Sequence, residues 1–425
     1  MKRTVRQNVK KRKSCEARAG GAAAPAPLDV STVDARAALV QALIPVALAY
    51  VGELLVEEVA SVAGPRYARD DGASSRVRWG QQRGSIYLGH QKVGIVVPRV
   101  RDRATNREVG LPTYAALQQP RTIDQALMRT ILGGVSMREY GRCVSLIPSA
   151  FGLSGSTISR RFQAATRRRL RALHERWLGG EQIVAMVLDG KTFAADAMVV
   201  AVGVWATGEK RILGFVQTAT ENRVVCADFL RSLLARGLCI APGILVVIDG
   251  SKGLRAAVAE AFGARAVVQR CQWHKRENVV RYLPPLQQRG IRKKLQAAYE
   301  QPTYERARKA LQKVRREVAL LNLSAAASLD EGFEETLTLH RLGCFRTMGV
   351  SLKTTNILES IHARIASRTD KVDHWKTSEQ KQRWVATALL DLEPRLHRVK
   401  HFESLPDLQR ALARATRIAT KEHAA

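Results

Sequence analysis

Two acidic residues stand at the ends of two similar apolar segments. The first segment is Met186-Val-Leu-Asp-Gly-Lys191, and the second is Val246-Val-Ile-Asp-Gly-Ser-Lys252. In each, a run typical of a buried strand ends in Asp, and the Gly that follows lets the chain turn sharply. Ligands of α/β sheets bind outside the carboxyl ends of the strands, so Asp189 and Asp249 are candidate site residues. The alternative is ordinary turn chemistry, in which Asp-Gly is common.

These two carboxylates suit a divalent cation. Neighbouring strands would place them about 5 Å apart across the ladder. Two anionic groups that close repel each other unless a cation lies between them, and Mg²⁺ prefers oxygen ligands of this kind. A two-metal phosphoryl displacement needs a third acid. The candidate is Glu359, in the segment Thr354-Thr-Asn-Ile-Leu-Glu-Ser360.

Glu359 lies in a segment with helical spacing, which a threonine at its start can cap. Asn356 lies about one turn before Glu359, and Arg364 and Arg368 share an i,i+4 face from which they are candidate phosphate contacts. The alternative is that Glu359 is a solvated surface residue, as a lone Glu on a helix ordinarily is. The apolar stripe beside it consists of Leu358, Ile361 and Ile365.

Several strands and helices must position these acids. Strands are predicted over residues 183–188, 198–205, 212–217, 243–248 and 266–269, and helices over 222–236 and 251–262. Three successive strands suit an antiparallel meander, and a helix that returns the chain produces a parallel strand. The pattern therefore predicts an α/β fold with a mixed five-stranded sheet. From residue 275 to 343 the sequence has helical patterns only.

A basic helix is predicted before this sheet. It covers residues 157–178, with Ser156 as its N-cap, and it follows a break at Gly152-Leu-Ser-Gly155 and a short helix that begins at Ser136. A helix–turn–helix places its second helix in the major groove, with later basic residues on phosphate. The alternative is a solvated basic helix between domains. The candidate DNA contacts are Thr157, Arg160, Arg161, Arg167, Arg168 and Arg169.

The composition agrees with a polyanionic partner. The 425 residues contain 69 Lys and Arg against 38 Asp and Glu, a net charge of +31. Basic residues that neutralise phosphates release condensed counterions, which favours binding to nucleic acid. With 46% hydrophobic residues the chain can bury a core, so a wholly disordered protein is excluded. The alternative is a merely basic protein without such a partner.

The sequence indicates a cytoplasmic protein. Six Cys without a Cys-x-x-Cys pair fit a reducing compartment rather than a disulfide scaffold. The most apolar stretch, residues 38–51, is too short for a membrane span, which needs roughly 20 residues. The sequence contains no phosphate-binding loop of the GxxxxGK[ST] type, so it gives no indication that the protein uses ATP.

Four motifs, in order, resemble mutator-type transposases of bacterial insertion sequences. They are Leu188-Asp-Gly190, Ile248-Asp-Gly-Ser-Lys-Gly-Leu254, Gln269-Arg-Cys-Gln-Trp-His-Lys-Arg-Glu-Asn278 and Thr354-Thr-Asn-Ile-Leu-Glu-Ser360. The resemblance covers about residues 75–400. It implies a ribonuclease-H-like core with an all-helical insertion, and a catalytic triad of Asp189, Asp249 and Glu359. This triad would hold two Mg²⁺ ions, for which Mn²⁺ can substitute.

Cys271 and His274 match the Cys-x-x-His signature of that family. Two such ligands fall short of the four that a structural zinc needs, so we predict that they pack the core and shape the site. His274 is expected near the scissile phosphate. Trp205 and Trp273 are predicted to be core residues rather than stacking platforms.

The resemblance and the residue patterns together predict six parts. They are a basic disordered arm and linker (1–30), a helical and small β-rich module (31–120), a helix–turn–helix-like region (121–180), the first part of the catalytic core (181–274), an all-helical insertion (275–345), and the last part of the core with the Glu359 helix (346–425).

The leading functional hypothesis is a DNA transposase. Its partners would be the terminal inverted repeats of the element and target DNA, and two paired ends imply at least a homodimer on DNA, at the bacterial nucleoid. One alternative is a catalytically silent, transposase-derived DNA-binding protein. The other is a structure-selective nuclease.

Overall fold

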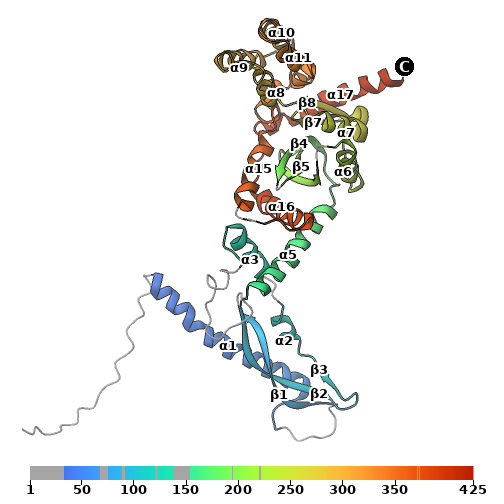
Figure 1. The fold of residues 1–425 in the computed structure, drawn as a ribbon. Coiled ribbons are helices and arrows are strands. Elements are labelled where there is room, and N and C mark those ends of the chain that lie inside the picture. Colours follow the sequence, from blue (N-terminus) through green and yellow to red (C-terminus); the bar gives the residue numbers. More distant parts are fainter. Residues whose placement is uncertain are drawn as a thin grey trace, which may run out of the picture. The chain divides into compact units, whose positions relative to one another are not determined.

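The computed structural model describes residues 33–67, 75–88, 91–119, 123–137, 154–193, 195–219, 222–370, 372 and 374–424 (Figure 1). The chain divides into two compact units, Met1–Gln119 with Ser145–Ala150 and Pro120–Val144 with Phe151–Ala425. The arm and linker predicted over residues 1–30 lie outside the described residues. In the described part of the chain, no helix is long and apolar enough to cross a bilayer.

A long helix and a small antiparallel sheet form the described part of the first unit. Val51, Leu55 and Val59, which lie one turn apart along the helix, are buried against the sheet. This spacing gives the helix one apolar face, which anchors it. The strands pair in the order β1-β2-β3. The elements are α1 (Val33–Ala63), β1 (Arg76–Leu88), β2 (Gln91–Asp102), β3 (Arg107–Val109) and α2 (Pro112–Leu117).

A mixed five-stranded sheet lies at the centre of the second unit, as the sequence predicted. Its order is β6-β5-β4-β7-β8. The β6–β5 and β5–β4 pairs are antiparallel, whereas β4–β7 and β7–β8 are parallel. Continuous apolar runs form β4 and β7 because both faces of these strands are covered. The strands are β4 (Ile183–Phe193), β5 (Asp196–Trp205), β6 (Lys210–Thr218), β7 (Ile244–Ile248) and β8 (Ala266–Arg270).

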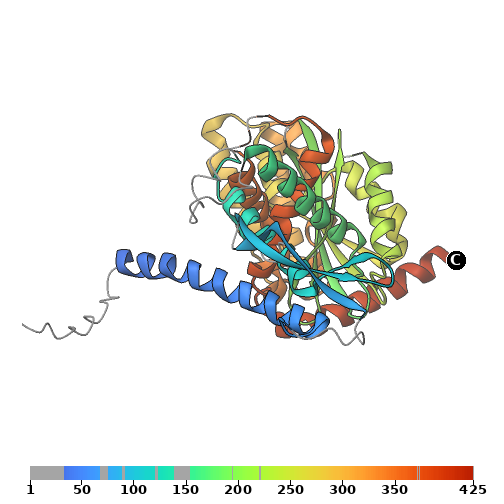
Figure 2. The ribbon, with the colours of Figure 1, turned by 90° about the horizontal axis from the view of Figure 1, so that it is seen from below.

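Alternate residues of the strands enter two hydrophobic cores. On β7, Val246 and Ile248 pack in the core that contains α6 and α7, whereas Leu245 and Val247 pack in the core that contains α14 to α17. Figure 2 shows the yellow-green helices α6 and α7 on one side of the sheet. The helices on the two faces are α6 (Arg223–Ala235), α7 (Lys252–Phe262), α14 (Phe345–Leu352), α15 (Asn356–Thr369), α16 (Ser378–Leu392) and α17 (Leu405–Ala424).

The segment between β8 and α14 is helical throughout and has its own core. Leu295, Leu311 and Leu329 are fully buried in that core. The segment stands at the top of the second unit in Figure 1. Its helices are α8 (Gln272–Val280), α9 (Pro285–Tyr299), α10 (Tyr304–Leu321), α11 (Leu323–Asp330), α12 (Phe333–Thr336) and α13 (Thr338–Arg341).

The basic helix α5 begins and ends earlier than predicted. It covers Gly155–Glu175, and its N-cap is Ser154, whose Oγ accepts a hydrogen bond from the Thr157 backbone. The prediction of Ser156 as N-cap was therefore wrong, because the earlier serine has the extended backbone that a cap requires. The helix–turn–helix break at 152–153 and most of the short helix from Ser136 lie outside the described residues.

Helix α5 packs in a small core with α3 (Ile123–Leu132) and α16. Ile158, Phe162 and Ala165 of α5 are buried there beside Trp384 of α16. One face of the basic helix is thus used for packing, and its remaining faces stay polar.

Candidate active site

Asp189 lies within β4 rather than at its end. The strand was predicted to stop at residue 188, but it continues to Phe193 because β5 pairs with it along this length, with Asp189 opposite Val200. The parallel pairing of β4 with β7 does stop at Leu188 and Ile248. Asp189 is therefore the first residue of β4 beyond the parallel ladder, and its side chain is buried.

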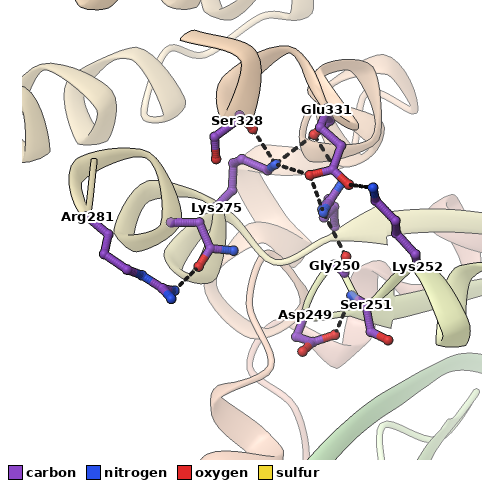
Figure 3. A network of polar contacts seen from close by, with 10 residues as sticks. Asp249, Gly250, Ser251, Lys252, Lys275, Arg281, Ser328 and Glu331 are labelled. Atoms are coloured by element: carbon purple, nitrogen blue, oxygen red, sulfur yellow. Dashed lines mark hydrogen bonds and ion pairs between the residues drawn. The ribbon is translucent and has the colours of Figure 1, made fainter. Parts of the chain in front are cut away.

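Asp249 directly follows the last residue of β7. Its Oδ1 accepts a hydrogen bond of 2.9 Å from the Ser251 backbone, an Asx-type turn that leads into α7 (Figure 3). Gly250 has φ +117°, a conformation that favours glycine. Since Leu188 and Ile248 are paired, the next residues along the two chains are Asp189 and Asp249. These two residues are neighbours at the carboxyl end of the parallel pair.

Asp189 lies on the sheet face that α15 covers, because side chains alternate along a strand and Asp189 shares the face of Val187. Asp249 lies beyond the end of β7, in the turn that leads into α7. Val187 and Val247 pack in the same core as Leu358 and Ile361 of α15.

Glu359 lies in the first turn of α15. Its Oε1 is buried and has no hydrogen-bond partner among the described residues. A buried carboxylate oxygen without a donor is costly, because it has lost its water and gained nothing in exchange. A buried carboxylate oxygen without a donor fits the role of a cation ligand. The oxygen donors of two Asp and one Glu suit Mg²⁺.

His362 is the residue that sequence reasoning missed. It follows Glu359 by about one turn, and its Nε2 lies 3.9 Å from Asp189 Oδ2, too far for a hydrogen bond. This nitrogen is buried without a hydrogen-bond partner in the described part of the chain. Burial, together with the charge of Lys191, lowers the pKa of His362 to about 4, so the ring is neutral at pH 7. Its only signal in the sequence was its position on the stripe of Leu358, Ile361 and Ile365.

The three acids do not form a finished metal centre in this structure. Within the residues that the structure describes, no three His, Cys, Asp or Glu side chains are placed to hold an ion. The orphaned atoms of Glu359 and His362 and the buried Asp189 nevertheless fit a divalent cation by their donor chemistry.

A cleft of about 290 Å³ adjoins this site. Lys191, two residues beyond Asp189 on β4, and His362 contribute to its lining. Phe193 and Trp375 form an aromatic pair in the same lining, with ring centroids 4.9 Å apart.

The Cys-x-x-His pair holds the start of the Glu359 helix. Cys271 is fully buried, and its Sγ lies 3.7 Å from the hydroxyl of Thr355, which donates to it. His274 Nδ1 lies 3.3 Å from the same hydroxyl. Thr355 is the N-cap residue of α15, so both side chains fix the point where that helix begins. Burial raises the pKa of Cys271, which keeps the thiol protonated.

Trp205 is buried as expected, but Trp273 is not a core residue. Its side chain is 41% exposed and stands edge-on to His274, with ring centroids 4.8 Å apart. It lies on the outward face of α8, which a short amphipathic helix always leaves in water.

Among the residues predicted at α15, Asn356 and Arg364 are exposed, but Arg368 has a protein partner. Arg368 Nη2 donates a 2.9 Å hydrogen bond to Asp391 of α16, and both side chains are largely buried. A buried ion pair of this kind joins two helices, and losing either partner would leave an unpaired charge.

The candidate DNA contacts on α5 also include both exposed residues and residues that contact other parts of the protein. Arg160 and Arg168 are exposed, and Thr157 and Arg161 are partly exposed. Arg167 donates to Glu379 of α16 at 2.6 Å, and Arg169 is half-buried beside the Thr387 carbonyl at 3.5 Å. Burial lowers the pKa of Arg169. Since α5 packs on α16, these two side chains contribute to that packing, which the sequence did not show.

These features define a class: an α/β protein with two carboxylates just beyond the paired residues of two adjacent parallel strands, and a third acid on a helix that packs on the sheet. The chain belongs to a known family within the transposases. The family described as "Transposase, Mutator family" matches residues 26–398, most of the chain.

Its relatives are transposases of insertion sequence elements. The transposase for insertion sequence element IS256 in transposon Tn4001 of Staphylococcus aureus is 23% identical over 314 residues, 70% of this chain and 76% of the relative. The transposase for ISRM5 of Rhizobium meliloti is 27% identical over 300 residues, 68% of this chain and 73% of the relative. The transposase for IS406 of Burkholderia multivorans is 28% identical over 330 residues, 73% and 79% respectively. Membership in this family implies action on DNA.

Proposed function

We propose that this transposase binds the terminal inverted repeats of its element and uses Asp189, Asp249 and Glu359 to cleave and join DNA strands. One observation carries the proposal. Asp189 and Asp249 come directly after the last paired residues of two adjacent parallel strands, and the first turn of α15 supplies a glutamate whose buried oxygen has no partner among the described residues. Family membership agrees with it.

The core is, in this proposal, ribonuclease-H-like. Three antiparallel strands followed by two parallel strands, with helices on both faces, support this interpretation. The helical segment between β8 and α14 is the insertion, which returns the chain to the sheet at the Glu359 helix.

Asp189, Asp249 and Glu359 would hold two Mg²⁺ ions, with Mn²⁺ as a substitute. Bound divalent cations supply Lewis-acid stabilisation to the attacking and leaving oxygens of the phosphodiester. The protein's own groups prepare the site: the neutral ring of His362 adds no positive charge beside Asp189, and Thr355 with Cys271 fixes where α15 begins. Water would cleave the strand and leave a free 3′-hydroxyl. This hydroxyl would then attack a phosphodiester of target DNA and displace a 3′-oxygen of the target strand as the new bond forms.

DNA binding would use the exposed basic residues. Arg160, Arg168 and Arg364 are exposed, and we assign phosphate contacts to them first. Arg167, Arg169 and Arg368 contact α16 and contribute to DNA binding mainly by long-range attraction. A homodimer or larger assembly on paired element ends, at the bacterial nucleoid, follows from the need to join two ends.

The test is incubation of the full chain with candidate element ends and Mg²⁺, with the cut strands resolved on a denaturing gel. We expect a nick at the element boundary and, with target DNA added, a joined product. Binding without cleavage in Mg²⁺ or Mn²⁺ would favour a transposase-derived DNA-binding protein. Cleavage without a specific end sequence and without joined product would identify a nuclease.

A further inference from the structure

A buried arginine lies beside the Asp249 turn. Arg270 ends β8, and its backbone pairs with Ile248, the residue just before Asp249. Its side chain is 6% exposed, so the guanidinium has left water and must be hydrogen-bonded by the protein.

The guanidinium joins two turns that are far apart in the sequence. Arg270 Nη2 donates a 2.7 Å hydrogen bond to the carbonyl of Gly250, and Nη1 donates one of 3.0 Å to the carbonyl of Glu331. Gly250 belongs to the turn after β7, whereas Glu331 is the C-cap residue of α11 in the helical segment. The guanidinium is planar and donates from two separate nitrogens, so one side chain reaches both carbonyls.

Both turns are shaped around this side chain. Gly250 has φ +117° and Gly332 has φ +68°. A Cβ atom at either glycine would overlap the Arg270 guanidinium. Close approach by a buried side chain thus requires glycine on both sides.

A second buried cation holds the helical side of the contact. Lys275 of α8 is 1% exposed, and its Nζ donates to the carbonyls of Ser328 at 2.6 Å and Glu331 at 2.7 Å (Figure 3). These carbonyls lie at the C-terminal end of α11, where a helix has unsatisfied acceptors and favours a cation. The Glu331 carbonyl is therefore fixed from two directions.

We propose that Arg270 is a positioning residue for Asp249. Its hydrogen bonds connect the Asp249–Gly250 turn with the Glu331–Gly332 turn at the end of α11, a connection called the tie below. The orientation of the Asp249 carboxylate therefore depends on how the helical segment packs on the sheet. The importance of that orientation rests on the proposed function, whereas the tie itself does not. Misplacement of a reacting group by about 1 Å costs on the order of 10²-fold in rate, so the effect on cleavage is large.

The test compares Arg270→Lys and Gly332→Ala, which disturb the tie from opposite sides, with Arg281→Lys as the matched control. Arg281 is exposed, and its Nη2 donates a 2.6 Å hydrogen bond to Asn278 Oδ1 (Figure 3). The first measurement is hydrogen exchange of residues 249–252 in the full chain without metal or DNA. We expect exchange in both variants to be about 10- to 100-fold faster there, the equivalent of one charge-assisted hydrogen bond, with the core of the helical segment unchanged.

The second measurement is Mn²⁺ affinity of the DNA-bound protein by electron paramagnetic resonance. We expect about a 10-fold loss in the two variants, a loss typical of residues that support metal ligands, with unchanged DNA affinity and no loss in Arg281→Lys. Unchanged exchange at 249–252, or exchange that rises equally across the unit, overturns the inference. So does unchanged Mn²⁺ affinity where Asp249→Asn abolishes it. If Asp249→Asn leaves Mn²⁺ binding intact, the proposed function is wrong instead. The hydrogen-exchange measurement then still shows whether Arg270 holds the Asp249–Gly250 turn.

Discussion

At the scale of single residues, the candidate site depends on carboxylates whose environments differ. Asp189 is buried in a strand, Asp249 accepts a backbone hydrogen bond in a turn, and Glu359 has a buried oxygen without a donor in the described part of the chain. The proposed meeting of these three anionic groups at the carboxyl end of the parallel strands is unfavourable unless positive charge is supplied there.

Replacing any one acid by its amide tests this arrangement. We expect Asp189→Asn, Asp249→Asn and Glu359→Gln each to reduce strand cleavage by at least about 10³-fold, because electrostatic stabilisation of the reacting phosphate is the largest catalytic contribution. Binding of element ends, measured by gel shift, should change little. Asp228→Asn, an exposed acid of α6, is the matched control. A variant that keeps wild-type cleavage removes its residue from the triad.

His362 is expected to support Asp189 without touching DNA. We predict that His362→Phe, which keeps the ring and removes both nitrogens, lowers the cleavage rate about 10- to 100-fold, as substitutions around metal ligands do. DNA affinity should stay within about twofold. His374→Phe, an exposed histidine between α15 and α16, is the control. Equal cleavage rates of the wild type and His362→Phe would show that the ring contributes only to packing.

At the scale of elements, buried polar contacts hold the helical segment together. His340 of α13 is buried, with Nε2 at 3.1 Å from the carbonyls of Tyr299 and Gln301, and its ring stacks on Phe345. Since carbonyls only accept, Nε2 carries a hydrogen. Burial lowers the pKa of His340 to about 4, so the ring is neutral at pH 7.

This shift predicts a pH dependence of stability. The unfolded chain takes up a proton on this histidine below its ordinary pKa of about 6.5, and the folded chain only near 4, so stability falls as the pH drops through that window. We expect a contribution of about 2 kcal/mol, absent in His340→Gln and unchanged in the exposed His401→Gln. Chemical denaturation of the three proteins between pH 7 and 4.5 measures it. A parallel loss in all three would assign the effect to other groups.

At the scale of the whole molecule, charge dominates. A net charge of +31 attracts DNA from a distance, and each neutralised phosphate adds about 0.9 to the slope of log K against log salt. The basic segment 1–18 lies outside the described residues, yet its Lys and Arg are part of this charge.

Removing residues 1–18 should weaken binding to all DNA sequences and flatten the salt slope, because the contacts that it supplies are to phosphate. Binding titrations at several salt concentrations measure both effects. A version with Gln in place of Lys and Arg in this segment controls for chain length. An unchanged slope would show that the segment does not contact phosphate.

The local pattern of residues was sufficient to predict the strands, the mixed sheet and the positions of Asp189, Asp249 and Glu359 along the chain. Apolar runs, turn glycines and helical spacing are short-range signals, so they can be read without knowing the fold. The ends of elements were less accessible: β4 passes residue 188 because β5 pairs with it, and α5 begins at Ser154.

Only the tertiary structure decided which side chains face one another. His362 lies near Asp189, Arg270 joins the turns at Gly250 and Glu331, and Arg368 pairs with Asp391, all across elements remote in the sequence. The physical reason is that burial and pairing depend on how helices pack on the sheet. A one-dimensional pattern gives each residue's type and face, and packing alone determines its partner.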